Sequence, residues 1–197
     1  MYLTHTAHWQ FLGLLIGVVA WILTMAAAGL NEWRLWYVND VSVINSGVAW
    51  VGIWRACFYS HLLDSFLPAE IPAAQVLMIL AVIFGLAGNI SAAVAMRLAY
   101  FSVEEQGKIP AVFVLAGALY LLTATTSMVP LMWNMSSVLR NGTIEFPNDS
   151  YLPAAPARQS VGAAIGVGII ACVMMLLSGH TGNQTSNFPI RGQLPRR

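Results

Sequence analysis

The chain has 197 residues, of which 58% are apolar and only 9% are charged, and its mean hydropathy is +0.69. Soluble domains carry about 25% charged residues, so this composition excludes a disordered chain and a coiled coil and argues against an ordinary water-soluble enzyme. Nine basic and eight acidic residues give a net charge of +1, without the positive field of a nucleic-acid binder, and we expect no nucleic-acid partner.

Four apolar segments are long enough to cross a bilayer as helices. About 20 apolar residues, rising 1.5 Å each, cross a hydrocarbon layer of roughly 30 Å. The segments without Asp, Glu, Lys or Arg that meet this length are residues 9–30, 72–96, 110–133 and 161–178. Each is expected to be helical, because lipid offers no partner to unpaired backbone groups. The sequence therefore predicts an all-α membrane fold, a four-helix transmembrane bundle forming a single domain over residues 1–197, with the lipid bilayer as its first partner.

The first segment allows two interpretations. Residues 25–29 resemble a signal-peptide cleavage site, but the amino end has no Lys or Arg and the apolar run is longer than a typical signal core. We therefore expect an uncleaved helix.

Four crossings place both termini on one side of the membrane. If that side is cytoplasmic, its short segments carry Arg97, Lys108, Arg191, Arg196 and Arg197, against four basic residues outside. The higher basic density predicts cytoplasmic termini and a cytoplasmic tail over residues 179–197. Residues 31–70 and 134–159 are then extracellular.

The first extracellular segment is rich in strand-forming residues. Residues 32–38, 41–44 and 48–59 form extended runs separated by turn signals. This pattern predicts a small antiparallel β-meander from the first loop, stabilised by packing on the helices. The second segment contains Phe146-Pro147 and further prolines, which predict an exposed bent loop. Asn141 and Asn148 start glycan-acceptor triplets there, although such triplets also arise by chance.

The order and spacing of Trp33, Gly52-Ile53-Trp54 and Cys57 resemble the extracellular signature of the claudin family. The resemblance covers about residues 10–179. It includes Phe146-Pro147, where the second claudin loop carries an aromatic-Asn-Pro turn, as a second-loop contact. The stretches 32–37 and 67–71 look most like the atypical branch numbered thirty-four. Taken singly, Trp33 and Trp54 could be ordinary interface aromatics, but in this order we expect them to pack the meander onto the helix ends, with Gly52 allowing close backbone approach.

The resemblance implies a tight-junction structural and cell-adhesion protein of the plasma membrane. Such a protein associates with itself or other claudins, laterally and across facing cells, and contributes to a paracellular barrier. The alternative is an auxiliary or trafficking tetraspan subunit of the wider claudin-like superfamily, without junction-sealing activity. We expect no enzymatic activity, cofactor or metal: the spans lack paired carboxylates or a Ser-His-Asp set, and His5 and His8 have no further ligands nearby.

Several features depart from the family pattern. Claudins join two signature cysteines in a disulfide, but this loop has only Cys57, because Cys172 lies inside the fourth span. The spacings on both sides of Cys57 are explained most simply by a deletion that fused the two positions; the alternative is a gene-model or splice error. The stretch that sets ion preference in claudins is missing, so we expect a weak or absent channel. Gln75 replaces the Arg usual at the start of the second span, and the chain ends in residues 194–197, Leu-Pro-Arg-Arg, which predicts no PDZ ligand.

Asn89 is the strongly polar residue in the middle of a span. An amide in hydrocarbon seeks a hydrogen-bond partner on another helix. We expect an interhelical contact rather than an ion site, because no acidic residue lies in any span.

Overall fold

The computed structural model describes residues 2–37, 48–54, 70–101, 109–140 and 158–184, with the side chains of 2–8, 49 and 182–184 left out. Within these ranges the chain forms four helices and three short strands. The helices are α1 (Tyr2–Gly29), α2 (Glu70–Phe101), α3 (Ile109–Leu139) and α4 (Ala163–Gln184), and the strands are β1 (Arg34–Tyr37), β2 (Val48–Val51) and β3 (Arg158–Val161). All four helices are long and apolar enough to cross a membrane. The predicted fold class, a four-helix membrane bundle with a small antiparallel sheet, is confirmed.

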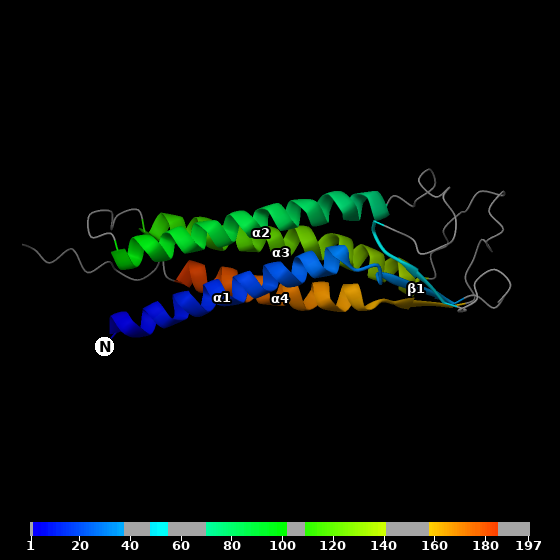
Figure 1. Ribbon diagram of the computed structural model, residues 1–197, viewed down its shortest axis with the longest axis horizontal. Helices are drawn as coiled ribbons and strands as arrows, with labels where there is room; N and C mark the ends of the chain where they lie inside the picture. Colours follow the sequence, from blue (N-terminus) through cyan, green and yellow to red (C-terminus); the bar gives the residue numbers. More distant parts are fainter. Residues whose placement is uncertain (1, 38–47, 55–69, 102–108, 141–157, 185–197) are drawn as a thin grey trace, which may run out of the picture.

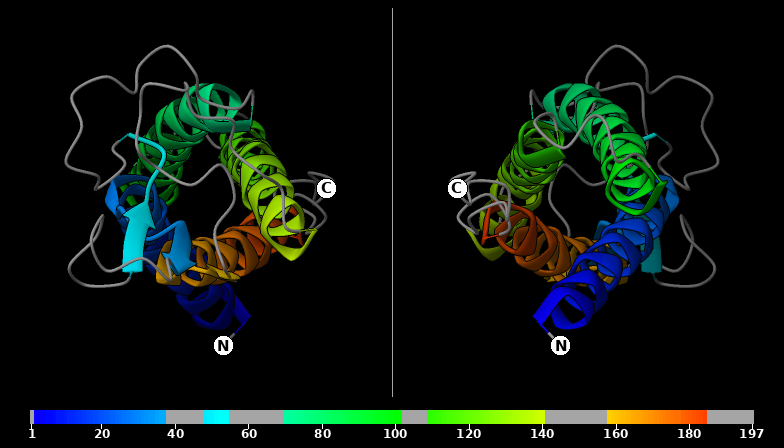
Figure 2. Two further views of the ribbon diagram at one scale, coloured as in Figure 1. Left: turned by 90° about the vertical axis from the view of Figure 1, so that its right-hand side faces the viewer. Right: turned by 90° about the vertical axis from the view of Figure 1, so that its left-hand side faces the viewer.

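The helices form a closed ring in chain order, and the sheet lies at one end of it (Figures 1 and 2). α1 packs against α2 and α4, and α3 packs against the same two helices from the other side. We call the two ends of the bundle the sheet end and the far end. The amino end of α1 lies at the far end, as Figure 1 shows.

Two of the helices are longer than the hydrocarbon layer requires. α2 has 32 residues and α3 has 31, so each is about 47 Å long against a layer of roughly 30 Å. The predicted spans, 72–96 and 110–133, end sooner because they were limited by the first charged or polar residues. Such residues mark where lipid contact ends, but they do not terminate a helix whose backbone bonds are internal.

The sheet has the order β2-β1-β3, and both pairings are antiparallel. β1 and β2 lie inside two of the extended runs predicted in the first segment, whereas residues 41–44 lie outside the described residues. β3 corrects the sequence analysis, which expected an exposed loop up to residue 159 and a span from residue 161. These four residues, Arg-Gln-Ser-Val, contain a single strong strand former, so the backbone of β1 decides their conformation.

Small residues allow the bundle to close around one tyrosine. Tyr120 of α3 reaches across the interior, and a Cβ at Gly17 of α1 would lie 2.6 Å from its ring, while one at Gly88 of α2 would lie 3.0 Å from it. The Tyr120 hydroxyl donates a 2.8 Å hydrogen bond to Oδ1 of Asn89 on α2. One buried side chain therefore contacts two neighbouring helices where glycine leaves room for it.

Candidate functional site

The carboxyl end of α1 is capped by two tryptophans that follow it in the chain. The last carbonyls of a helix have no partner within it, and they are satisfied by side chains, by other backbone or by water. Trp33 Nε1 donates to the Ala27 carbonyl at 2.9 Å, and Trp54 Nε1 donates to the Ala28 carbonyl at 2.7 Å. The two tryptophans that the sequence analysis singled out thus fasten the sheet segment to α1.

The two indoles lie in different surroundings. Trp33 is 1% exposed and belongs to the core at the sheet end, together with Trp36, Ile53 and Met78. Trp54 is 44% exposed, so its ring is partly covered while its N–H is bonded, as is common for tryptophan at headgroup depth.

The amino end of α4 is capped by the backbone between α1 and β1. The N–H of Gly162 donates to the Trp33 carbonyl, and the N–H of Ala164 donates to the Glu32 carbonyl, both at 3.0 Å. A Cβ at Gly162 would lie only 1.9 Å from that Glu32 oxygen, so this approach requires glycine. The sequence analysis had no signal for this contact, since its partners are 130 residues apart in the chain.

A further contact joins the end of β2 to α2. Gln75 Nε2 donates to the Ile53 carbonyl at 2.6 Å, and Gly52 and Ile53 are both buried. The N–H of Trp33 donates to the Val51 carbonyl at 3.1 Å and extends the β1–β2 pairing. Gln75 thus supplies a neutral donor that joins this segment to α2.

A buried ionic cluster joins β1 to α2 and α3, and we call it the Arg34 clasp. Arg34 is 1% exposed, and its Nη2 contacts Oε1 of Glu70 at 2.5 Å. Nε and Nη2 donate to Oδ1 of Asn134 at 3.2 and 2.7 Å, and Ser137 Oγ donates to the same Glu70 oxygen at 2.7 Å. Asn134 Nδ2 in turn donates to the Pro130 carbonyl at 3.0 Å. Removing one partner of such a buried pair costs about 3–5 kcal/mol, because the other charge is left uncompensated.

The remaining face of the sheet points away from the bundle. Successive strand residues point to opposite faces, so Leu35 and Tyr37 lie on the other side of β1 from Arg34. Trp50 pairs with Leu35 in the register, and Trp50 and Tyr37 are 41% and 37% exposed. We call Leu35, Tyr37, Val48, Trp50 and Arg158 the outer face.

The structure brings together four of the site residues that the sequence analysis named. Trp33, Gly52, Ile53 and Trp54 meet at the sheet end, whereas Asn89 lies within the bundle beside Tyr120. The others, Cys57, Asn141, Phe146, Pro147 and Asn148, lie outside the described residues, as do the side chains of His5 and His8.

Sequence reasoning missed the polar side chains that hold the sheet on the helices. Arg34 was counted as an extracellular charge, Glu70 and Asn134 marked the limits of segments, and none of the three was given a bonding role. A signal was available: charged residues are 9% of the chain, so one directly beside a signature tryptophan is conspicuous, but nothing local reveals its partners.

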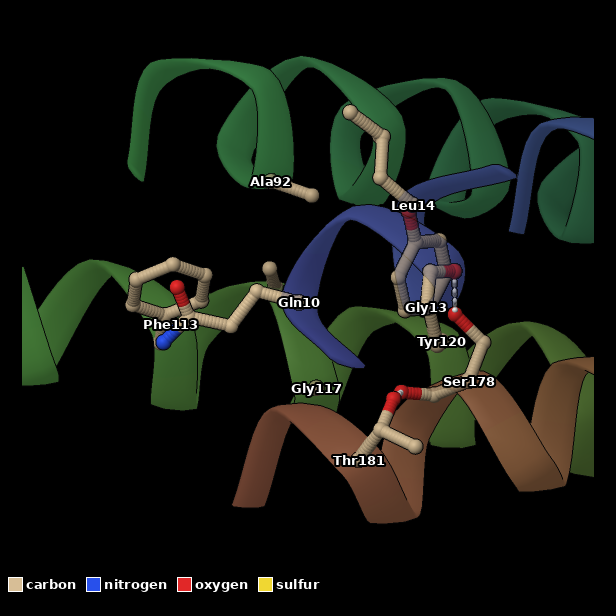
Figure 3. A pocket seen from close by; sticks show the side chains of 10 residues that line it. Gln10, Gly13, Leu14, Ala92, Phe113, Gly117, Tyr120, Ser178 and Thr181 are labelled. Carbon is tan, nitrogen blue, oxygen red and sulfur yellow. Dashed lines mark hydrogen bonds between the residues drawn. The ribbon is translucent and has the colours of Figure 1, made fainter. Parts of the chain in front are cut away.

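A small cavity lies toward the far end of the bundle (Figure 3). Its volume is about 20 Å³, and its lining includes Gln10, Leu14, Phe113, Tyr120 and Thr181. Ser178 Oγ donates to the Gly13 carbonyl at 2.7 Å beside it. This volume suits one water molecule.

Comparison with known proteins identifies the family to which a chain with this architecture belongs. Residues 61–181, more than half of the chain, match the family described as PMP-22/EMP/MP20/Claudin tight junction. The chain belongs to this family. It is 26% identical to mouse claudin-3 over 181 residues, covering 86% of this chain and 78% of that protein. It is similarly 26% identical to human claudin-4 and 27% identical to mouse claudin-5, with coverage of 94% and 95% of this chain and 89% and 91% of those proteins. This family member is therefore a multi-pass membrane protein with a claudin-type sheet at one end of its bundle.

Proposed function

We propose that this chain is a claudin-like tight-junction and cell-adhesion protein that contributes to a paracellular barrier. One observation carries the proposal: the sheet is fastened to all four helices while its outer face stays exposed. Trp33 and Trp54 hold it to α1, Gln75 to α2, the Arg34 clasp to α2 and α3, and the Glu32 and Trp33 carbonyls to α4. A surface that is rigid before contact loses little conformational entropy when it binds, which favours a contact module.

The outer face has the composition of a binding surface. Exposed Tyr37 and Trp50 are of the types that contribute most to protein interfaces, and Arg158 adds an exposed cation. We propose that its partners are further copies of this chain or other claudins, side by side in one membrane or on facing cells. The positive-inside pattern supports an extracellular sheet and cytoplasmic termini.

The proposal assigns the protein no enzymatic activity and no cofactor. Among the described residues, the side chains of the Arg34 clasp and of Gln75 bond to one another or to backbone, an arrangement that holds elements together. The cavity at the far end, among the described residues, has a volume that suits one water molecule.

Some finer assignments rest on the sequence alone. We propose Cys57 as the remaining signature cysteine, Phe146 and Pro147 as second-loop contacts, and Asn141 and Asn148 as glycan acceptors. The stretches 32–37 and 67–71 support kinship with the claudin branch numbered thirty-four.

Imaging in cells that lack endogenous claudins tests the proposal. A tagged chain is expressed in a mosaic of expressing and non-expressing cells, and enrichment is measured at each kind of contact. We expect enrichment where two expressing cells meet, together with a higher transepithelial resistance and no large charge-selective conductance. Trp50→Ser should reduce the enrichment at equal surface expression.

Tyr100→Ser is the matched control, because this aromatic residue is also exposed but lies near the carboxyl end of α2, away from the sheet. It should leave the enrichment unchanged. Uniform surface staining, with a channel or receptor co-purifying in fixed stoichiometry, would contradict the junction role and establish the auxiliary-subunit alternative.

A further inference from the structure

Strand β1 reads Arg34-Leu35-Trp36-Tyr37, so each of its two faces carries one aromatic side chain, Trp36 beside Arg34 and Tyr37 beside Leu35. The usual rule, polar residues outward and apolar residues inward, would bury Leu35 and Tyr37 and expose Arg34. The structure has the reverse: Arg34 and Trp36 are 1% and 2% exposed, and Tyr37 is outside. Something other than hydrophobic alternation therefore selects the facing of this strand.

The residues of the neighbouring strands do not determine which face of β1 points toward the bundle. In the register Arg34 stands beside Val51 and Val161, so the inward face is apolar around the cation. Leu35 stands beside Trp50, so the outward face carries large apolar side chains as well. Either face of the sheet could pack on the bundle by composition alone.

The inward position of Arg34 is matched by specific partners. Glu70 at the amino end of α2 supplies the opposite charge, Asn134 near the end of α3 accepts from two guanidinium nitrogens, and both lie at the level of β1. Ser137 donates to the same Glu70 oxygen and holds that carboxylate in place. A guanidinium without such partners does not remain buried.

We infer that the Arg34 clasp determines which face of β1 points toward the bundle, and therefore which residues the sheet presents outward. With the clasp intact, Leu35 and Tyr37 join Trp50 on the outer face. Without the Glu70 charge, Arg34 turns to solvent, β1 presents Arg34 and Trp36, and Leu35 and Tyr37 turn inward. Arg34 is then a positioning residue for the outer face, and the inference rests on the proposed function only in treating that face as a contact surface.

Cysteine labelling measures directly which residues of β1 are accessible to solvent. Tyr37→Cys and Trp36→Cys are each introduced into a Cys57→Ser background, and a water-soluble maleimide reports how fast each thiol reacts; Cys172 is buried. In the parent we expect position 37 to react at least tenfold faster than position 36. Glu70→Ala should reverse this order, slowing position 37 and speeding position 36, each about tenfold. Labelling is done on permeabilised membranes, so that variants retained inside the cell are read equally well.

A second substitution distinguishes a reversal of the two faces of β1 from a general loss of folding. Adding Arg34→Leu to Glu70→Ala removes the unpaired cation and should return both rates to those of the parent, whereas general unfolding would raise both rates together and would not be rescued. Glu32→Ala, which removes an exposed acid just before β1, is the matched control and should change neither rate. The inference is overturned if Glu70→Ala leaves both rates within twofold of the parent, if both rates rise together, or if Arg34→Leu fails to restore them. Because labelling needs no cell contact, its outcome is independent of the junction-imaging result.

Discussion

Gly162 is the position where a single added carbon most directly opposes the structure. An alanine Cβ there would lie 1.9 Å from the Glu32 oxygen, 2.5 Å from the Glu32 carbonyl carbon and 3.0 Å from the Trp33 carbonyl carbon. All three atoms are backbone, so the contact cannot be relieved by a side-chain rotation. Gly162→Ala must push the connection between α1 and β1 away from α4.

The magnitude follows from what that movement breaks. Two hydrogen bonds, from the N–H groups of Gly162 and Ala164, lengthen beyond 3.0 Å, and leaving a buried polar group unpaired costs about 1–3 kcal/mol. Overpacking adds about 1–3 kcal/mol. We therefore expect Gly162→Ala to lower the free energy of unfolding by about 3 kcal/mol or more.

The assay is unfolding of the purified protein in mixed micelles by increasing SDS, followed by tryptophan fluorescence. Gly166→Ala is the control, because it lies one turn later in α4 and its Cβ would meet nothing within 4 Å. Since alanine is also the better helix former, Gly166→Ala should be neutral or stabilise the protein by up to about 1 kcal/mol. Equal destabilisation by the two variants would refute the reasoning, because the effect would then not depend on the contact between Gly162 and the backbone of Glu32 and Trp33.

Three further predictions address the other contacts. Trp33→Phe, which leaves a buried carbonyl of α1 without its donor, should lower the free energy of unfolding by about 1–3 kcal/mol; Trp54→Phe should cost less, since water or headgroups reach its half-exposed site, and equal costs in the SDS titration would contradict this. A double-mutant cycle of Tyr120→Phe with Asn89→Ala should give a coupling energy of about 0.6–1.7 kcal/mol, and strictly additive effects would show that their hydrogen bond adds no stability. Gln75→Leu should accelerate hydrogen exchange of the β2 amides at least tenfold, whereas Gln75→Arg, which keeps a donor, should leave it nearly unchanged; no difference between the two variants would exclude a tethering role.

The transmembrane helices could be predicted because lipid imposes a simple requirement on the sequence. A span must be apolar for about 20 residues and must satisfy its own backbone, and both conditions can be read locally. The ends of α2 and α3 could not be read in the same way, since a helix whose backbone bonds are internal continues past the last apolar residue of the span.

The contacts between the sheet and the helices were predictable only in part, because the residues that make them are distant in the chain. The order of Trp33 and Trp54 pointed to a packing role, but their bonds to the α1 carbonyls depend on three-dimensional placement. Arg34 lies 36 residues from Glu70 and 100 from Asn134, and its inward position runs against the alternation of its own strand. β3 was missed for a related reason, since its four residues take their conformation from β1 rather than from their own composition.

The direct passage from β3 into α4 has a consequence for how membrane composition acts on the protein. A single residue, Gly162, separates the last residue of the strand from the first residue of the helix, and its N–H is bonded to the segment leading into β1. Because no flexible linker separates β3 from α4, we expect a change in the inclination of α4 to move the strand as well. Helices adjust their inclination to bilayers of different thickness, so we expect the orientation of the sheet to depend on the lipids that surround the bundle.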